Sequence, residues 1–408
     1  MLLTLRNRWP TSRPERHRKL LIVVGARLYI VRCCGSPKEM GAAQGSALQS
    51  KIRSAHQDVL RKLEAFRLQQ PRWLPYRAYR WLAEQKAWRF LAGPLSRDYP
   101  AMSQRLSGIA EGAGVSLKAI YLLNALEPLL SLVGGCTTCP GACSAVAVRG
   151  RRSATGEPII ARNFDYLPLA QPYYAVRESR PQQKQRALEF TLAPSAGSVD
   201  GMNEEGLCIV YNYAYTTDTP SATTAPISMA ISEALERCST VTEAAEWIPL
   251  RPRWGGGLLM LADATGDIAS LELSSTRSHL RRPPPGEDVL FHTNALSDAH
   301  MQEIQVPWEA TYTDRAPVPL RGRRVHQSSE LRGRRFEQLL AETEIFGPDE
   351  LAVVMADHGP NGVADDCTPC VHSSYWCTTA CLQFFPRSRR MRVAYETACQ
   401  ARYEEVGL

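Results

Sequence analysis

The chain has 408 residues, of which 44% are hydrophobic and 22% charged, an ordinary composition for a globular protein. No run of 18 apolar residues occurs, so we expect no membrane-spanning helix. The net charge is +7, but the first 20 residues hold six basic residues against one acid. The rest of the chain is therefore near neutral, and its composition indicates no nucleic-acid partner.

The N-terminal tail, residues 1–26, is rich in arginine and poor in acids, as organelle presequences are. Its apolar stretch, Leu20–Ala26, is short for a secretory signal, and no small-residue cleavage site follows. Another explanation of the tail is that translation starts at an upstream codon and adds residues that do not fold. We expect a disordered or dispensable tail and a cytoplasmic protein, with organelle targeting left open.

The chain contains 12 cysteines, which we interpret mainly as buried or free thiols in a reducing compartment. Two CxxC pairs, Cys136/Cys139 and Cys367/Cys370, could together form a four-cysteine zinc site. The pairs lie far apart in sequence and nothing else indicates a metal. We therefore expect neither a metal nor another cofactor.

Residues 36–130 have the apolar periodicity of helices. Residues 102–113 show it most clearly, with one apolar face formed by Met102, Leu106, Ile109, Ala110 and Ala113. Gly112 and Gly114 end this helix, and Ser116 is the expected N-cap of the next one.

At Cys143 the pattern changes to that of strands. The apolar run 143–148, a glycine-containing turn over 149–157 and a second run over 158–164 predict a hairpin. Further strands are expected at 189–192, 206–213, 258–262, 268–273, 289–292, 376–384 and 391–395. Helices are expected at 227–237, 240–248, where Thr240 and Glu243 form a capping box, and about 329–342. This order favours an α+β fold with two stacked antiparallel sheets and helices outside them.

A cysteine at the head of a buried strand becomes a self-sufficient nucleophile if the preceding peptide bond is cut. The new α-amine has an ordinary pKa of about 8 and can take the thiol proton, so no catalytic histidine is needed. Such a site also needs a cation near the thiol, an acceptor for the amine and donors for the oxyanion. Arg162 and Asp165 return beside Cys143 across the hairpin, and Asn212 and Asn294 lie late on predicted strands.

The order of these segments resembles one known family. Cys143–Val148, followed by a turn and Ala161–Tyr166, is similar to the start of the catalytic chain in the isopenicillin N acyltransferase-like (acyl-CoA:6-aminopenicillanic acid acyltransferase) family. These are N-terminal-nucleophile hydrolases related to choloylglycine hydrolases. Further similar segments are Gly35–Gly41, Leu106–Val115 and Asp200–Leu207, so the resemblance spans about residues 27–395.

The resemblance implies an αββα sandwich, self-cleavage at Ala142–Cys143, and hydrolysis or transfer of the acyl group of a small linear amide. It implies that Cys143 is the nucleophile, that Arg162 lies near the thiol and substrate, and that Asp165 holds the α-amine. Asn212 and Asn294 would orient the amine and help to form the oxyanion hole, and Arg332 would be the second arginine, with Arg335 as the competing assignment. Residues 27–142 and 143–408 would become two subunits that stay associated as one globular unit.

Several alternatives remain open. Ala142 stands where glycine is commoner in the family, which is a departure from the family pattern at the expected cleavage site. Cys136 is a rival nucleophile in a similar local motif, but Pro140 would interrupt a strand there, and the 22-residue gap from Cys143 to Asp165 suits a hairpin better than the 29 from Cys136. A Cys-His hydrolase using His292 or His358, or a non-catalytic binding protein of the same fold, would also fit.

The substrate is expected to be a small-molecule amide or acyl donor. Tyr166, Tyr211 and Tyr213 lie on or beside strands next to the proposed site and are candidates for an apolar acyl pocket. Ordinary packing within the sheet is an equally good explanation of these tyrosines.

Overall fold

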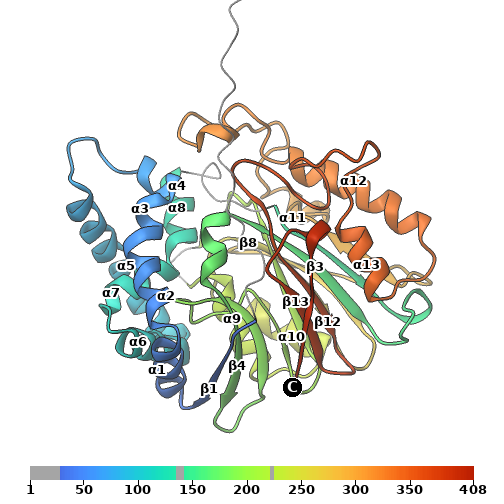
Figure 1. Ribbon diagram of the computed structural model, residues 1–408, viewed down its shortest axis with the longest axis horizontal. Coiled ribbons are helices and arrows are strands. Elements are labelled where there is room, and N and C mark those ends of the chain that lie inside the picture. Colours follow the sequence, from blue (N-terminus) through green and yellow to red (C-terminus); the bar gives the residue numbers. More distant parts are fainter. Residues whose placement is uncertain (1–27, 135–141, 221–224) are drawn as a thin grey trace, which may run out of the picture.

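The computed structural model describes residues 28–134, 142–220 and 225–408. The basic tail and the Cys136/Cys139 pair lie outside the described residues. The described chain forms two β-sheets packed face to face, with a helical layer on the outside of each (Figure 1). The predicted α+β, αββα fold class is confirmed.

The first sheet has eight strands in the order β1-β4-β5-β6-β7-β8-β9-β10. All its neighbouring strands are antiparallel except β1 and β4, which are parallel at one edge. The strands are β1 (Ile30–Gly35), β4 (Tyr174–Pro181), β5 (Ala187–Leu192), β6 (Asp200–Asn203), β7 (Cys208–Ala214), β8 (Gly256–Ala262), β9 (Ile268–Leu273) and β10 (Ser278–Arg281).

The second sheet has six antiparallel strands in the order β11-β2-β3-β12-β13-β14. The strands are β2 (Ser144–Val148), β3 (Ile159–Tyr166), β11 (Val289–His292), β12 (Cys377–Phe385), β13 (Arg390–Ala394) and β14 (Glu404–Gly407). β2 and β3 form the predicted hairpin, with Ser144 opposite Asn163. This hairpin is central in its sheet and is buried on both sides, which explains its nearly continuous apolar sequence.

The layer between the sheets is an apolar core to which both contribute. Cys143, Ala145 and Phe164 meet Phe190 and Val210 across it. Because successive side chains of a strand alternate between its faces, Val146 and Ala161 point the other way, toward the outer helices.

The outer face of the first sheet is covered by the N-terminal helices, together with α9 and α10. In Figure 1 the N-terminal helices form the left-hand layer, whereas α9 and α10 are drawn nearer the centre. The helices of this face are α1 (Pro37–Ala47), α2 (Gln49–Ser54), α3 (Leu60–Lys62), α4 (Glu64–Leu68), α5 (Tyr76–Asp98), α6 (Pro100–Ala113), α7 (Leu117–Asn124), α8 (Leu126–Gly134), α9 (Ile227–Leu235) and α10 (Val241–Trp247). As predicted, Ser116 caps α7 by accepting a hydrogen bond from the Ala119 amide.

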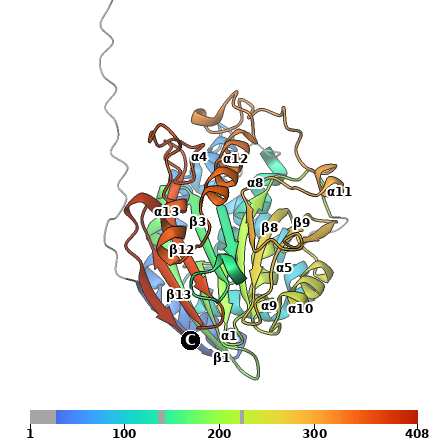
Figure 2. The same ribbon diagram turned by 90° about the vertical axis from the view of Figure 1, so that its right-hand side faces the viewer.

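The outer face of the second sheet is covered by α12 (Gln327–Glu342) and α13 (Pro348–Met355). Figure 2 views the molecule from this side, with both helices over β3 and β12. The short helix α11 (Ala299–Gln302) lies in the long connection between β11 and α12. No helix of the described residues is long and apolar enough to cross a membrane.

Helices α1 and α6 pack with their backbones in contact. A Cβ atom added to Gly41 would lie 2.0 Å from the Arg105 carbonyl oxygen, and one added to Gly108 would lie 2.1 Å from that of Lys38. Gly45 and Gly112, one turn further along each helix, are equally close to the facing backbone. The Gly-x-x-x-Gly spacing in both helices therefore serves this close approach.

Several strands are absent from the sequence prediction: β1, β4, β6, β10 and β14. In β4 the reason is the charge of its residues, Arg177 and Glu178 among them. Arg177 is nevertheless buried, because its guanidinium forms two hydrogen bonds with Glu189 of the neighbouring strand, at 2.8 and 2.9 Å. A strand that carries a buried ion pair of this kind lacks the apolar pattern by which strands are predicted from sequence.

Candidate active site

Cys143 is the residue immediately before β2, a strand inside the second sheet with β11 and β3 on either side. Its side chain is buried and belongs to the core between the two sheets. Ala142, on the other side of the predicted cleavage bond, is also fully buried. The bond that would be cut therefore joins two buried residues.

The Cys143 thiol lies between a cation and a carbonyl group. Arg162 Nη2 donates a hydrogen bond to Sγ at 3.2 Å, and the thiol donates to the Asp165 carbonyl oxygen at 3.8 Å. Burial raises the pKa of Cys143, and the Arg162 guanidinium opposes that rise. In this uncut chain the thiol therefore keeps its proton at neutral pH.

Arg162 is held rigidly although it is fully buried. Its Nη1 donates to Asp200 Oδ1 and to the Tyr211 carbonyl oxygen, both at 2.6 Å, and its guanidinium lies over the Phe164 ring. Both partners in the Arg162–Asp200 ion pair have no exposed side-chain surface. Nη1 thus reaches the first sheet, while Nη2 is directed at the cysteine on the neighbouring strand of its own sheet.

Asp165 has one satisfied and one unsatisfied carboxylate oxygen. Oδ1 accepts a hydrogen bond from the Thr378 hydroxyl at 2.6 Å, whereas Oδ2 is buried and has no hydrogen-bond partner among the described residues. Burial raises the pKa of Asp165 to about 7, although Arg332 and Arg162 oppose the rise. An additional cation near Oδ2 would satisfy this oxygen and favour the ionised carboxylate.

Arg332, on α12, reaches the head of β2 from the opposite side. Its Nη1 donates to the Cys143 carbonyl oxygen at 2.8 Å and to the Ser144 hydroxyl at 2.6 Å, and its Nη2 donates to Asn294 Oδ1 at 2.8 Å. The competing assignment, Arg335, lies one helical turn further and pairs with Asp357 instead. Of the two arginines, Arg332 is the one that contacts the cysteine.

Asn212 and Asn294 form a reciprocal link between β7 and the segment that follows β11. Asn212 Nδ2 donates to the Thr293 carbonyl oxygen at 3.0 Å, and Asn294 Nδ2 donates to that of Tyr213 at 2.8 Å. Both side chains are fully buried. Each amide nitrogen has a second hydrogen, so each can donate once more.

The three tyrosines have different neighbours. Tyr166 stacks on Phe164 and lines a cavity of about 60 Å³ together with Leu126 and Tyr173. Tyr211 is buried, and its hydroxyl donates to Glu127 at 3.0 Å, while Tyr213 packs edge to face against Tyr215. Of the three, Tyr166 lines this cavity, and the assignment of Tyr211 and Tyr213 to an acyl pocket stays a prediction.

A larger apolar cavity, of about 310 Å³, lies among α4, α5, α7 and α8. Leu126 lines both this cavity and the smaller one beside Tyr166. The other apolar residues that line the larger cavity are Phe66, Pro71, Leu74, Tyr79, Leu82, Ala83, Leu122, Leu129 and Leu130.

The histidines proposed for a Cys-His mechanism have other neighbours. The His292 ring nitrogen Nδ1 lies 2.9 Å from the Ser270 hydroxyl, and burial lowers the pKa of His292 well below its usual value. His358 lies near Cys370 and His372. Among the described residues, the hydrogen bonds of the Cys143 thiol are with Arg162 and Asp165, so this geometry gives no support to a histidine base.

Sequence reasoning missed two residues that hold the site together. Asp200 anchors Arg162, and Thr378 anchors Asp165. Asp200 opens one of the segments that carried the family resemblance, which was a usable signal. Thr378 gave none, because a threonine within an apolar strand is ordinary β-sheet composition.

The architecture and this site define the class of protein: two stacked sheets between helical layers, with a buried cysteine at the head of a central strand, as in N-terminal-nucleophile hydrolases. A model of the acyl-coenzyme A:6-aminopenicillanic acid acyl-transferase family matches residues 152–391, more than half of the chain. The chain therefore belongs to that family, whose chemistry is amide hydrolysis or acyl transfer. The matched region includes Arg162, Asp165, Asn212, Asn294 and Arg332 and begins after Cys143.

Comparison with curated protein sequences found no match. Similar solved structures include a Caenorhabditis elegans N-acylethanolamine-hydrolyzing acid amidase ortholog, with 13% identity and a TM-score of 0.40, covering 65% of this chain and 100% of that one. A mutant conjugated bile acid hydrolase from Clostridium perfringens has 13% identity and a TM-score of 0.37, covering 65% and 92%. Penicillin V acylase from Agrobacterium tumefaciens has 14% identity and a TM-score of 0.36, covering 65% and 86%. With scores this low, the family assignment rests on the sequence model.

Proposed function

We propose that the chain is a self-cleaving cysteine amidohydrolase or acyltransferase that acts on a small linear amide through a thioester on Cys143. The observation that carries the proposal is the contact of the buried Cys143 thiol with Arg162, at 3.2 Å. A buried cysteine that only fills space does not need a guanidinium directed at its sulfur, whereas a nucleophilic sulfur is stabilised by one.

The first step would be self-cleavage. Cys143 Sγ attacks the carbonyl carbon of Ala142, the C–N bond breaks, and the thiol proton passes to the nitrogen that becomes the α-amine. Water then hydrolyses the resulting thioester, releasing the carboxyl group of Ala142. The products are the fragments 1–142 and 143–408, and Cys143 is left with both its thiol and a free amine.

The new amine would change the chemistry of the site. It supplies a base of ordinary pKa about 8 next to a thiol that otherwise keeps its proton. The unsatisfied Oδ2 of Asp165 is a ready acceptor for it. In its ammonium form, the amine would lower the pKa of Asp165, so that carboxylate and ammonium hold each other in place.

Turnover would repeat the same chemistry on a substrate. The Cys143 thiol attacks the carbonyl carbon of the substrate amide, and the amine part of the substrate leaves with the thiol proton. The acyl group then passes from the thioester to water or to a second amine. In this proposal Asn212 and Asn294 supply N–H donors for the oxyanion, and Arg332 fixes both Asn294 and the Cys143 carbonyl. Removal of one oxyanion donor typically lowers kcat about 10² to 10³-fold.

The acyl group is proposed to be apolar or a small aminoacyl group, not a protein. Two features support an apolar chain: the cavity beside Tyr166 is lined by leucine and tyrosine, and it shares Leu126 with the larger apolar cavity of about 310 Å³ among the N-terminal helices. A pocket of this size accommodates a small-molecule ligand.

The proposal is tested by the intact mass of the purified full-length protein and N-terminal sequencing of its larger fragment. We expect two fragments, the larger beginning Cys-Ser-Ala-Val. Cys143→Ala should remain uncut and inactive, and Cys143→Ser should cut slowly and turn over poorly. Cys136→Ala is the matched control and should behave as wild type. A single uncut chain that is nevertheless active would contradict the proposed self-cleavage.

The substrate is found by a screen of N-acyl amino acids, phenylacetyl and fatty acyl amides, penicillins, conjugated bile salts and N-β-alanyl amines. A substrate acyl group trapped on Cys143 and detected by mass spectrometry would support the thioester. A cut protein that acylates Cys143 with none of these compounds and only binds them would instead be a non-catalytic relative.

A further inference from the structure

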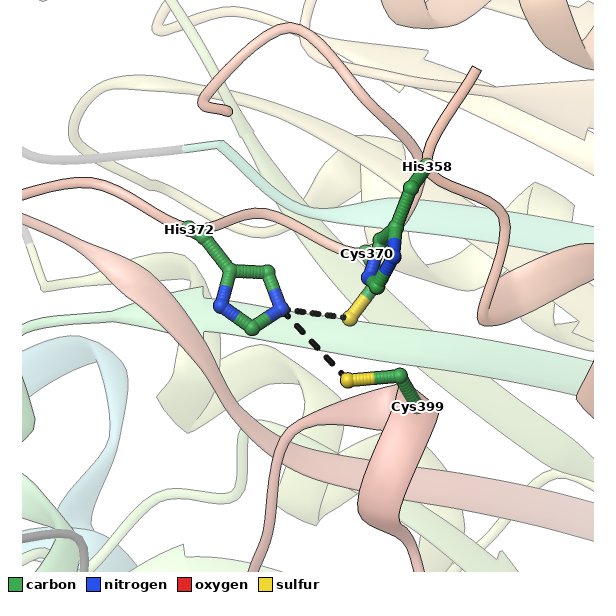
Figure 3. A group of neighbouring side chains, drawn as sticks. All are labelled: His358, Cys370, His372 and Cys399. Carbon is green, nitrogen blue, oxygen red and sulfur yellow. Dashed lines mark hydrogen bonds between the residues drawn. The ribbon is translucent and has the colours of Figure 1, made fainter. Parts of the chain in front are cut away.

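A second group of chemically active side chains lies near the C-terminus, outside the proposed active site. It consists of two cysteines and two histidines: Cys370, Cys399, His358 and His372 (Figure 3). The four come from the loop after α13, the segment before β12 and the 3₁₀ turn Ala398–Gln400. In sequence they extend over 42 residues in an irregular spacing, so no sequence motif indicates them.

One ligand atom from each of the four residues lies within 4.8 Å of every other. The Cys370 and Cys399 sulfurs lie 3.3 and 3.6 Å from His372 Nε2. In a tetrahedral zinc site with ordinary Zn–S and Zn–N bonds, ligand atoms are about 3.3 to 3.8 Å apart. Two of the separations therefore already match a metal site, and small side-chain rotations would bring the others into range.

His358 provides the independent observation. Its Nε2 is buried and has no hydrogen-bond partner among the described residues, and its ring lies 5.1 Å from that of His372, edge to face. A buried ring nitrogen without a partner is unfavourable, and a metal ion at the centre of the group would satisfy it. The Thr397 hydroxyl, 3.5 Å from Cys399 Sγ, gives that sulfur an additional contact.

We propose that His358, Cys370, His372 and Cys399 form a structural zinc site. Two thiolates and two imidazoles in a tetrahedron are the ligand set that zinc prefers, and four protein ligands leave no open position for catalysis. The two thiols lose their protons to solvent when the metal binds. The set differs from the CxxC pairs considered from sequence, because Cys367 lies beside Asp366 instead.

The proposed zinc site is joined to the head of the active-site hairpin by short hydrogen bonds. Val371, between two of the ligands, donates its amide to the Thr378 hydroxyl at 2.9 Å, and that hydroxyl donates to Asp165. Asn163 of β3 donates to the Pro369 carbonyl oxygen at 2.9 Å. If the proposed function holds, the metal fixes the loop that orients Asp165, and residues of the zinc site act as positioning residues for it.

The test is the metal content of the full-length protein, purified without an affinity tag that binds metals and dialysed against metal-free buffer. We expect about one zinc per chain, both in the wild type and in uncut Cys143→Ala, so the result does not depend on the proposed function. Cobalt substituted for zinc should give the intense visible bands of a tetrahedral site and the charge-transfer bands of thiolate ligands.

Cys399→Ser is the informative variant, because Cys399 is exposed and its loss should not prevent folding. It should lower zinc affinity at least about 10-fold and weaken the thiolate charge-transfer band. Cys367→Ser, a thiol of the same loop, and Cys34→Ser, an exposed thiol elsewhere, are the matched controls and should keep the metal. A chelator should lower the Tm of the wild type and leave that of Cys399→Ser nearly unchanged.

The proposal is overturned if the wild type neither contains zinc nor takes it up, or if a Cys370–Cys399 disulfide is found by mass spectrometry in protein purified without air. It is also overturned if Cys367→Ser loses the metal as completely as Cys399→Ser does, since the ligand set would then be a different one.

Discussion

At the residue scale, the state of Cys143 follows from opposing effects on one thiol. Burial favours the neutral form, and Arg162 at 3.2 Å favours the thiolate. Since burial is the larger effect and the pKa is raised, the uncut chain holds a poor nucleophile. In the proposed function this thiol needs to react only once in the uncut chain, and its activation for repeated turnover would come from the amine that cleavage creates.

Asp165 yields a prediction about pH and stability. In the uncleavable Cys143→Ala background its folded pKa of about 7 lies above the ordinary 3.8. As pH rises from about 4 to about 7, the unfolded chain releases this proton before the folded one does, so stability should fall in that window and level off above it. The full effect is up to about 4 kcal/mol, at roughly 1.4 kcal/mol for each pKa unit.

Asp165→Asn in the same background should remove this fall. It should unfold at the same temperature as its parent near pH 4 and at a higher one near pH 8, as measured by thermal unfolding across pH. Asp349→Asn, at a side chain that is 91% exposed, is the control and should leave the profile in place. Identical profiles for Asp165→Asn and its parent would contradict a buried, mostly protonated Asp165.

At the element scale, α12 carries two arginines whose roles are separated by its geometry. Arg332 contacts Cys143, Ser144 and Asn294, whereas Arg335 pairs with Asp357 near the surface. Arg332→Met should reduce self-cleavage and turnover about 10²-fold or more, because Asn294 and the Cys143 carbonyl lose their common donor. Arg335→Met should leave both nearly unchanged and cost at most about 1 kcal/mol. Equal losses of activity in the two variants would remove Arg332 from the site.

The contact between α1 and α6 gives a second prediction at this scale. Gly41→Ala or Gly108→Ala would place a methyl group about 2 Å from a carbonyl oxygen of the other helix, so the helices must separate. We expect a loss of about 1 to 3 kcal/mol or more in the free energy of unfolding, measured by urea titration. Gly333, within α12, has one atom near the added Cβ, the Thr293 hydroxyl oxygen at 4.0 Å, which is ordinary contact. Gly333→Ala should therefore be stabilising by up to about 1 kcal/mol, through helix propensity alone. A neutral Gly41→Ala would mean that the helices are further apart.

At the scale of the whole molecule, cleavage before Cys143 would not divide the protein into separate domains. The N-terminal part supplies β1, the edge strand that pairs with β4 along all six of its residues. Gln44 accepts a hydrogen bond from Arg177 at 2.8 Å, and the buried Arg105 pairs with Glu236 at 3.0 Å. Helices of the N-terminal part and strands of the C-terminal part share one apolar core.

We therefore predict that the two fragments remain together after cleavage. Size-exclusion chromatography should give one species of the size of uncut Cys143→Ala, and denaturing electrophoresis of that species should show both fragments in equal amounts. Separation of the fragments in native buffer would show that the shared sheet and core are weaker than their burial indicates.

The sequence by itself determined the local elements and their order. Period-2 and period-3.6 apolar patterns are properties of neighbouring residues, so the β2–β3 hairpin, α9, α10, α12 and the capped start of α7 could be predicted from it. The hairpin pattern also predicts that Cys143, Arg162 and Asp165 lie side by side, because the register of a short antiparallel pair follows from its turn. Each of these inferences concerns residues that are close in the chain.

Only the tertiary structure decided which distant residues meet. Asp200 and Thr378 hold Arg162 and Asp165 from other strands, and Arg332 rather than Arg335 faces Cys143 because of how α12 is rotated on its sheet. β4 was hidden by charges that are neutralised only once β5 lies beside it. His358, Cys370, His372 and Cys399 have no regular spacing and converge only when α13 and the 3₁₀ turn 398–400 pack around the end of β12. Long-range pairing depends on how the elements pack, and no local pattern of residue types encodes it.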